Sequence, residues 1–163
     1  MNVKNHCRSV FPALVALVLL AGCGQPNTDK TPAATGALAP DAGGLTLDTF
    51  GDFPPEIDGC SCYFSSDSAA FGKGQFLYVN DYMETSFLKI NGVLTKFVQT
   101  SLEEIDGATS VMTAKAGDQY ELTIEIEAGS QNGDETWLKT GRLKVTDKSG
   151  HTVSTAFYGE CGC

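Results

Sequence analysis

Hydrophobic and polar residues alternate along much of the chain after residue 44, with the period of two that is typical of β-strands. In "QYELTIEIEA" at 119–128, apolar residues stand at positions 120, 122, 124 and 126, and Thr or Glu stands between them. Such alternation predicts a strand with one buried and one exposed face. Its outer face is expected to carry Glu121, Glu125 and Glu127.

Two further stretches predict hairpins. In "SFLKINGVLTKFV" at 86–98, Asn91-Gly92 separates two β-rich runs, and this dipeptide favours the type I′ turn because it tolerates positive φ. In "GRLKVTDKSGHTVSTAFYG" at 141–159, a looser turn is expected at 147–150.

The remaining strands are expected in "CSCYFS" at 60–65, "GQFLYVND" at 74–81 and "TSVMTAKA" at 109–116. Only "SLEEIDG" at 101–107 suggests helix, as one turn with Ser101 as its cap and Glu104 at the third position. We therefore expect an all-β fold, a small antiparallel β-barrel or sandwich of about eight strands, in one domain over 45–163.

The N-terminus has the features of an export signal. Lys4 and Arg8 precede an apolar run from Val10 to Leu20, which is too short for a membrane span and suits a signal-peptide core. The run ends in "LAGC" at 20–23, which resembles the lipobox of bacterial lipoproteins. The resemblance implies cleavage of residues 1–22 and lipidation of Cys23. Gly24, in place of the Asp that commonly retains such proteins at the inner membrane, implies the outer membrane.

Residues 23–44 follow as the lipidated cysteine and a tether. "GQPNTDKTPAATGALAPDAGG" is rich in Pro, Gly, Ala and Thr and has no apolar periodicity. This composition predicts a disordered segment between the lipid and the domain.

The charge balance excludes one class of partner and favours another. The chain has 20 acidic and 11 basic residues, and cleavage would remove two bases, which leaves a formal net charge of −11. Nucleic acid is excluded because its binding depends on basic patches. A basic protein would be attracted, although acidic residues often serve only to keep a surface soluble.

Four cysteines remain after cleavage and lipidation: Cys60, Cys62, Cys161 and Cys163. Residues two apart in a strand share a face, so each pair presents both sulfurs on one side. If the first and last strands are neighbours, two disulfides link them, as export permits. An antiparallel pair gives Cys60–Cys163 and Cys62–Cys161, and a parallel pair gives Cys60–Cys161 and Cys62–Cys163.

The same four thiolates are the alternative site for a metal. Four sulfurs can hold Zn²⁺ or Cu(I), but the spacing departs from the Cys-x₂-Cys of zinc sites and no His stands beside either pair. We expect no cofactor. A redox pair would need Cys-x-x-Cys near a helix N-terminus, which the sequence does not offer.

Catalytic motifs are sparse, and we expect that the protein is not an enzyme. Neither G-x-S-x-G nor H-E-x-x-H occurs, and His151, the one histidine outside the signal segment, stands at a turn. The aromatic residues Tyr78, Tyr82, Trp137 and Tyr158 can line a ligand cavity, although packing in the core and at its rim is the favoured role for such residues.

These features predict a lipid-anchored envelope β-domain that serves as a binding or structural module, with the membrane as partner through Cys23. The stretch "FLKINGVLTKF" at 87–97, the anchor and the acidity also resemble the membrane-bound lysozyme inhibitors. That resemblance implies a small disulfide-bearing β-barrel and inhibition of a cationic enzyme. The two Cys-x-Cys pairs depart from that family's pattern, so no inhibitory residue is carried over.

Overall fold

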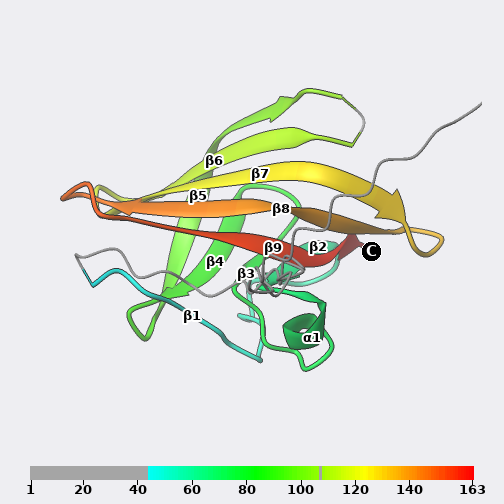
Figure 1. Ribbon diagram of the computed structural model, residues 1–163, viewed down its shortest axis with the longest axis horizontal. Helices are drawn as coiled ribbons and strands as arrows, with labels where there is room; N and C mark the ends of the chain where they lie inside the picture. The colour runs from blue at the N-terminus through cyan, green and yellow to red at the C-terminus, as the bar shows by residue number, and fades with distance from the viewer. Residues whose placement is uncertain (1–43, 107) are drawn as a thin grey trace, which may run out of the picture. The chain divides into compact units, whose positions relative to one another are not determined.

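The computed structural model describes residues 44–106 and 108–163 (Figure 1). Within them it contains one short helix and nine strands: β1 (Leu47–Asp48), β2 (Ser61–Ser65), α1 (Ser68–Phe71), β3 (Tyr78–Asn80), β4 (Thr85–Ile90), β5 (Val93–Glu104), β6 (Ser110–Ala116), β7 (Tyr120–Gln131), β8 (Thr136–Asp147) and β9 (Thr152–Gly162). The expected strands are all present. The predicted signal peptide, Cys23 and the tether up to residue 43 lie outside the described residues.

Eight of these strands close into an antiparallel barrel. The order around the barrel is β4-β3-β2-β9-β8-β7-β6-β5, and pairing of β4 with β5 completes the circle. The short β1 adds to β4 through Leu47 and Asp48, opposite Ile90 and Lys89. The all-β prediction is confirmed, and of its two architectures the barrel is the one that forms. Closure matters physically because it removes the unpaired edges of an open sheet.

Local turn chemistry fixes the hairpins. Asn91 and Gly92 have φ of 48° and 81°, as a type I′ turn between β4 and β5 requires. Between β8 and β9, the Asp147 carboxylate accepts hydrogen bonds from the amides of Ser149 and His151 at 2.8 and 2.9 Å. Both predicted hairpins are confirmed.

The predicted helical turn at 101–107 is wrong, because residues 101–104 are the end of β5. The strand continues past a β-bulge at Thr100, and the Ser101 hydroxyl bonds the Thr113 hydroxyl of β6 at 2.7 Å instead of capping a helix. Pairing with β6 therefore outweighed the local capping signal. The helix of the described region is α1, whose cap Asp67 accepts from the Ala70 amide at 2.8 Å.

The barrel interior is packed with apolar side chains. Inward positions of neighbouring strands meet in layers, as Leu143 of β8 lies opposite Ile124 of β7 and Val145 lies opposite Val153 of β9. These side chains are at most 2% exposed. Burial of such residues is the main favourable term in folding, at about 25 cal/mol per Å² of apolar area.

Strand directions define two ends of the barrel. The loops from β3 to β4, from β5 to β6 and from β7 to β8 all lie at one end, together with the start of β2 and the end of β9. We call this the mouth end; it lies to the right in Figure 1, and the tight turns at 117–119 and 148–150 lie to the left. The ladder therefore brings chain segments far apart in sequence together at one rim.

An aromatic cluster covers the outside of the barrel wall at β2 and β9. The Tyr63 ring stacks on Phe71 of α1 with ring centres 5.5 Å apart, and Phe71 meets Tyr158 edge-on. The Tyr63 hydroxyl donates to Glu160 at 2.8 Å. Burial and this carboxylate raise the pKa of Tyr63 to about 12, so the phenol stays protonated as a donor.

Among the described residues, the structure has no helix that could span a lipid bilayer.

Candidate functional site

The four cysteines form two disulfides across β2 and β9. Ser61 and Cys62 of β2 lie opposite Gly162 and Cys161 of β9 in antiparallel register. The bonds join Cys62 to Cys161 and Cys60 to Cys163, with Cα atoms 4.0 and 4.2 Å apart. The antiparallel alternative of the sequence analysis is confirmed, and the parallel pairing is wrong.

The two disulfides have different surroundings. Cys62 and Cys161 are buried and belong to the core, whereas Cys163 is exposed and Cys60 is half-buried at the rim. With all four sulfurs bonded in pairs, a thiolate metal site would require both bonds to be reduced. Within the described residues, no group of three or more His, Cys, Asp or Glu side chains is arranged to hold a metal ion.

A cavity of about 330 Å³ opens at the mouth end, inside the barrel. This volume lies at the lower end of the range of small-molecule sites. Its floor is apolar and is formed by Phe64, Tyr78, Met112, Ile124 and Ile126, with the Cys62–Cys161 disulfide. The inner disulfide is therefore part of the cavity wall as well as a crosslink.

Polar side chains border the same cavity at separate positions on the wall: Asn80, Gln99, Glu104, Ser110 and Lys139. The β5 bulge sets part of this arrangement, because it shifts the alternation of the strand and turns Leu102 and Glu104 inward beyond Gln99. Lys139 lies across Gly129 of β7, where a Cβ atom would come within 2.8 Å of its Nζ. An apolar floor with a few directed polar groups is the usual composition of a ligand site.

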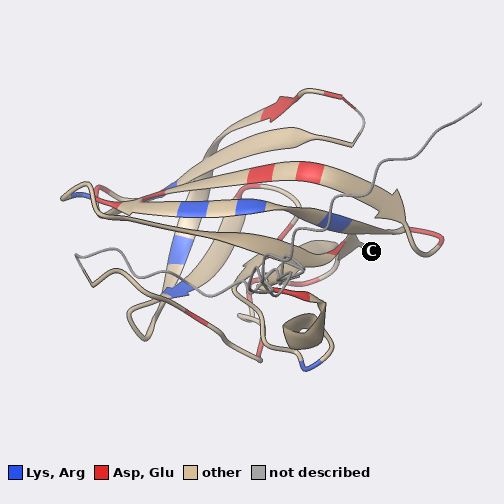
Figure 2. Ribbon diagram, in the orientation of Figure 1, with Lys and Arg blue, Asp and Glu red and all other residues tan. Residues whose placement is uncertain are grey.

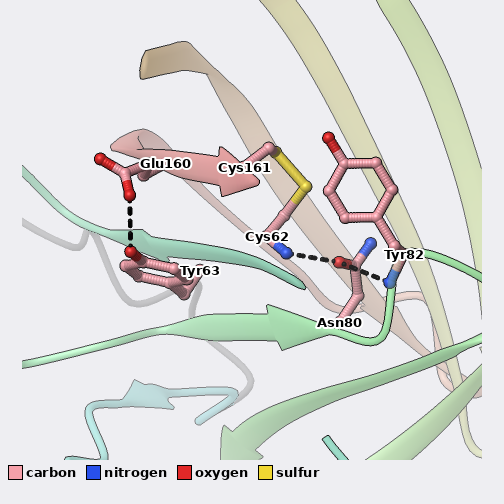
Figure 3. The surroundings of a disulfide bond; sticks show 6 residues. All are labelled: Cys62, Tyr63, Asn80, Tyr82, Glu160 and Cys161. Carbon is pink, nitrogen blue, oxygen red and sulfur yellow. Dashed lines mark hydrogen bonds between the residues drawn. A yellow bond between two sulfur atoms is a disulfide. The ribbon is translucent and has the colours of Figure 1, made fainter. Parts of the chain in front are cut away.

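Tyr82 stands at the mouth of the cavity in a constrained conformation. Its φ is +63°, which a bulky side chain adopts rarely. The Asn80 side-chain oxygen accepts from the amides of Cys62 at 2.9 Å and Tyr82 at 3.3 Å, and Asp81 accepts from Met83 at 2.9 Å. Figure 3 shows the Tyr82 ring on the same side of β3 as the Cys62–Cys161 disulfide. Asn80 thus connects the disulfide strand to the loop that carries Tyr82.

The mouth end is strongly acidic. Its three hairpin ends consist of residues 80–85, 103–106 with 108–110, and 131–139. They include the single base Lys139 and seven acidic side chains: Asp81, Glu84, Glu103, Glu104, Asp106, Asp134 and Glu135. Figure 2 shows acidic residues on the loops after β5 and after β7 at this end. Large apolar side chains are exposed beside them, with Met83 at 74%, Leu102 at 54% and Ile105 at 64%.

The predicted outer face of β7 is confirmed, and its charges are partly matched by its neighbours. Glu121 and Glu125 are exposed, and Glu127 lies at a bulge opposite β8. Glu121 forms an ion pair with Lys115 at 2.8 Å, which lowers the pKa of Glu121. Glu125 lies opposite Arg142. Figure 2 shows the basic bands of β8 beside the acidic bands of β7.

The structure separates the four aromatic residues that were candidates for a cavity. Tyr78 and Tyr82 line it, and burial raises the pKa of both. Tyr158 lies in the outer aromatic cluster. Trp137 is register partner of Cys161 at the mouth end but is not among the residues that line the cavity. His151 pairs with Asp147 at 2.9 Å in the turn between β8 and β9, away from the cavity.

Sequence reasoning missed Met112, Gln99 and Lys139 as cavity residues. Met112 and Gln99 lie on inward positions of strands, where the pattern alone predicts core. Lys139 is a charged residue at an inward position, and alternation counted back from Leu143 and Gly141 would have placed it there. The bulge at Thr100 has no signal in the sequence, so the inward position of Glu104 could not be predicted.

Comparison of the chain with protein-family models, with curated proteins and with solved structures finds no match in any of the three.

Proposed function

We propose that the protein is a lipid-anchored binding module of the cell envelope, in which the cavity at the mouth end of the barrel holds the ligand. The observation that carries this proposal is the cavity itself, which combines about 330 Å³ of space, an apolar floor and separate polar groups. A barrel core of this size is normally filled by side chains, so an opening of this volume at one end is a distinguishing feature.

The anchor comes from the lipobox at 20–23, which supports attachment through Cys23 and, with Gly24, location at the outer membrane. The tether at 23–44 would give the barrel freedom to meet a ligand near the surface. Binding requires no group that reacts, in keeping with the expectation that the protein is not an enzyme and needs no cofactor.

Photolabelling of the full chain in its own membranes tests the proposal. The probe is 3-trifluoromethyl-3-phenyldiazirine, a small uncharged aromatic compound that inserts into nearby bonds on illumination. Peptide mass spectrometry should find adducts on the cavity floor, at Met112, Ile124 or Ile126, because apolar surface there is open to a small molecule.

A filled cavity provides the control. Ser110→Phe places a ring in the cavity, and Val111→Phe adds a ring of the same size on the other face of the same strand. Labelling of the floor should be lost in the first variant and kept in the second. Equal labelling of the floor in both variants would overturn the proposal.

A further inference from the structure

The mouth end combines an open apolar cavity with exposed apolar side chains around it. Tyr82 and Leu102 line the cavity while about half of each side chain remains exposed, and Met83 is exposed to an even greater extent. Tyr82 and Met83 belong to the β3–β4 loop and Leu102 to strand β5, so the apolar surface extends from inside the barrel onto its rim. Exposed apolar surface that leads into a pocket marks a place where another molecule binds.

The charge around this opening is asymmetric. The three hairpin ends at the mouth carry seven acidic residues and one base, whereas the connections at the other end, at 66–77, 91–92, 117–119 and 147–151, carry three acids and two bases: Asp67, Asp118, Asp147, Lys73 and Lys148. The negative potential is therefore concentrated at the entrance of the cavity. A partner with positive charge is attracted to this end more than to any other face described here.

Not all of the mouth-end acids are available to a partner in the same way. Asp81 accepts hydrogen bonds from the amides of Met83 and Thr85, and Asp106 accepts from Ala108 and Thr109. The bonds from Ala108 and Thr109 lower the pKa of Asp106, and each set of bonds fixes the conformation of its own loop. Glu84, Glu103 and Glu104 are exposed, so they can be neutralised with little effect on the loops.

We infer that the partner is a basic peptide segment of another protein, which inserts one apolar side chain into the cavity while its Lys or Arg residues meet the acidic rim. The inference rests on the proposed function, since it assigns a ligand class to the same cavity. The cavity volume accommodates a large side chain, and the acids are distributed over three separate hairpin ends, as suits several cations on one peptide. An anionic lipid surface is disfavoured by the same charges.

Lys139, in the lining of the cavity, favours apolar groups over cations there. It is the base among the residues that line the cavity, and Gly129 leaves room for its side chain to lie flat against β7. A positive group that entered deeply would meet this ammonium at short range. The apolar group of the partner therefore enters, and its cations remain outside.

The probe is a fluorescent heptapeptide, Lys-Lys-Lys-Phe-Lys-Lys-Lys, titrated against the full chain in nanodiscs of zwitterionic phosphatidylcholine. One comparison peptide has Ser in place of Phe, and another has Glu in place of every Lys. Anisotropy, corrected with empty nanodiscs, should show the Phe peptide bound about 10-fold more tightly than the Ser peptide. Its affinity should fall steeply with salt, and the Glu peptide should not bind.

Two triple variants locate the charge. Glu84→Gln with Glu103→Gln and Glu104→Gln should weaken the Phe peptide by about 10-fold. The matched control neutralises three exposed acids away from the mouth, Asp52→Asn with Asp118→Asn and Glu121→Gln, and should change affinity by less than about 2-fold.

Three results would overturn the inference: equal binding of the Phe and Ser peptides, equal effects of the two triple variants, or binding of the Glu peptide. If the diazirine labels the cavity floor and the Phe peptide fails, the ligand class alone is wrong. If neither probe reaches the cavity, the proposed function fails with it.

Discussion

Tyr82 lines the mouth of the cavity in a backbone conformation that is unfavourable for its residue type. Its positive φ is a conformation that costs about 1–3 kcal/mol for a non-glycine residue. Asn80 and Asp81 hold the loop through hydrogen bonds to the amides of Tyr82 and Met83. A strained aromatic residue at a cavity mouth indicates that its position matters more than its local stability.

Replacement of Tyr82 by Gly separates these two effects. Gly adopts positive φ freely, so Tyr82→Gly should leave the free energy of unfolding within about 1 kcal/mol of the wild type. Binding of the Phe peptide should weaken, because the ring no longer borders the cavity. Denaturant unfolding and anisotropy measure the two quantities. A loss of several kcal/mol would show that the ring is a core residue.

Gly159 is a residue on which the packing of β9 against β2 depends. A Cβ atom there would overlap the Tyr63 carbonyl oxygen and come within 2.6 Å of the Phe64 ring. Gly159→Ala should therefore lower the free energy of unfolding by about 1–3 kcal/mol. In the control Gly51→Ala the new Cβ would lie 3.6 Å from the Gly74 carbonyl oxygen, and a change within about 0.5 kcal/mol is expected. Equal melting temperatures for the two variants would contradict this account.

At the scale of elements, the pair β2–β9 is the most heavily crosslinked part of the barrel. The disulfides close loops with sequence separations of 99 and 103 residues. In the chain-entropy model the first such bridge stabilises by up to about 4.7 kcal/mol, and the second adds less because the large loop is already closed.

Loss of both bridges should be costly. The double variant Cys161→Ser with Cys163→Ser should lower the free energy of unfolding by about 4–5 kcal/mol, a large share of the roughly 5–15 kcal/mol typical of a domain. On oxidised wild type, thiol titration should find none of Cys60, Cys62, Cys161 or Cys163 free, and peptide mapping should join 60 to 163 and 62 to 161. Four free thiols with one bound Zn²⁺ or Cu(I) would contradict the crosslink and favour the metal alternative.

The strands differ in how far the sequence predicts them. Alternation predicted β7, and Asn91-Gly92 predicted the β4–β5 hairpin, because both signals are local. The prediction of a helical turn at the end of β5 was wrong. Residues 101–104 form hydrogen bonds with β6, and a local capping pattern does not reveal such tertiary pairing. The sequence predicted two disulfides between the first and last strands but left two pairings open, one for each relative strand direction. The antiparallel register of β2 with β9 selects one of them.

Over the whole molecule, acidic residues are distributed unevenly between the two ends of the barrel, and the composition alone does not reveal this. Net charge indicates only that the chain is acidic, whereas the topology brings seven of the acids together in the three hairpin ends at the mouth. The cavity follows from the same topology, since its lining comes from seven strands and the β3–β4 loop. A site assembled from so many segments has no motif in the sequence.

The membrane anchor is a prediction for the whole molecule that depends on one residue. Cys23→Ser should abolish incorporation of labelled palmitate, because the lipobox sulfur is the expected site of the diacylglycerol thioether. Cys7→Ser, a cysteine within the predicted signal peptide, is the control and should leave labelling unchanged. Palmitate that remains on the Cys23→Ser chain would place the lipid elsewhere.

Competition between the two probes decides whether the partner binds in the mouth-end cavity. The full chain in phosphatidylcholine nanodiscs is illuminated with the diazirine, with and without saturating Lys-Lys-Lys-Phe-Lys-Lys-Lys, and adducts are mapped. Bound peptide should remove label from Met112, Ile124 and Ile126, while label on exposed Val93, the first residue of β5 at the other end of the barrel, should be unchanged. Unchanged labelling of the cavity floor under bound peptide would contradict binding in this cavity.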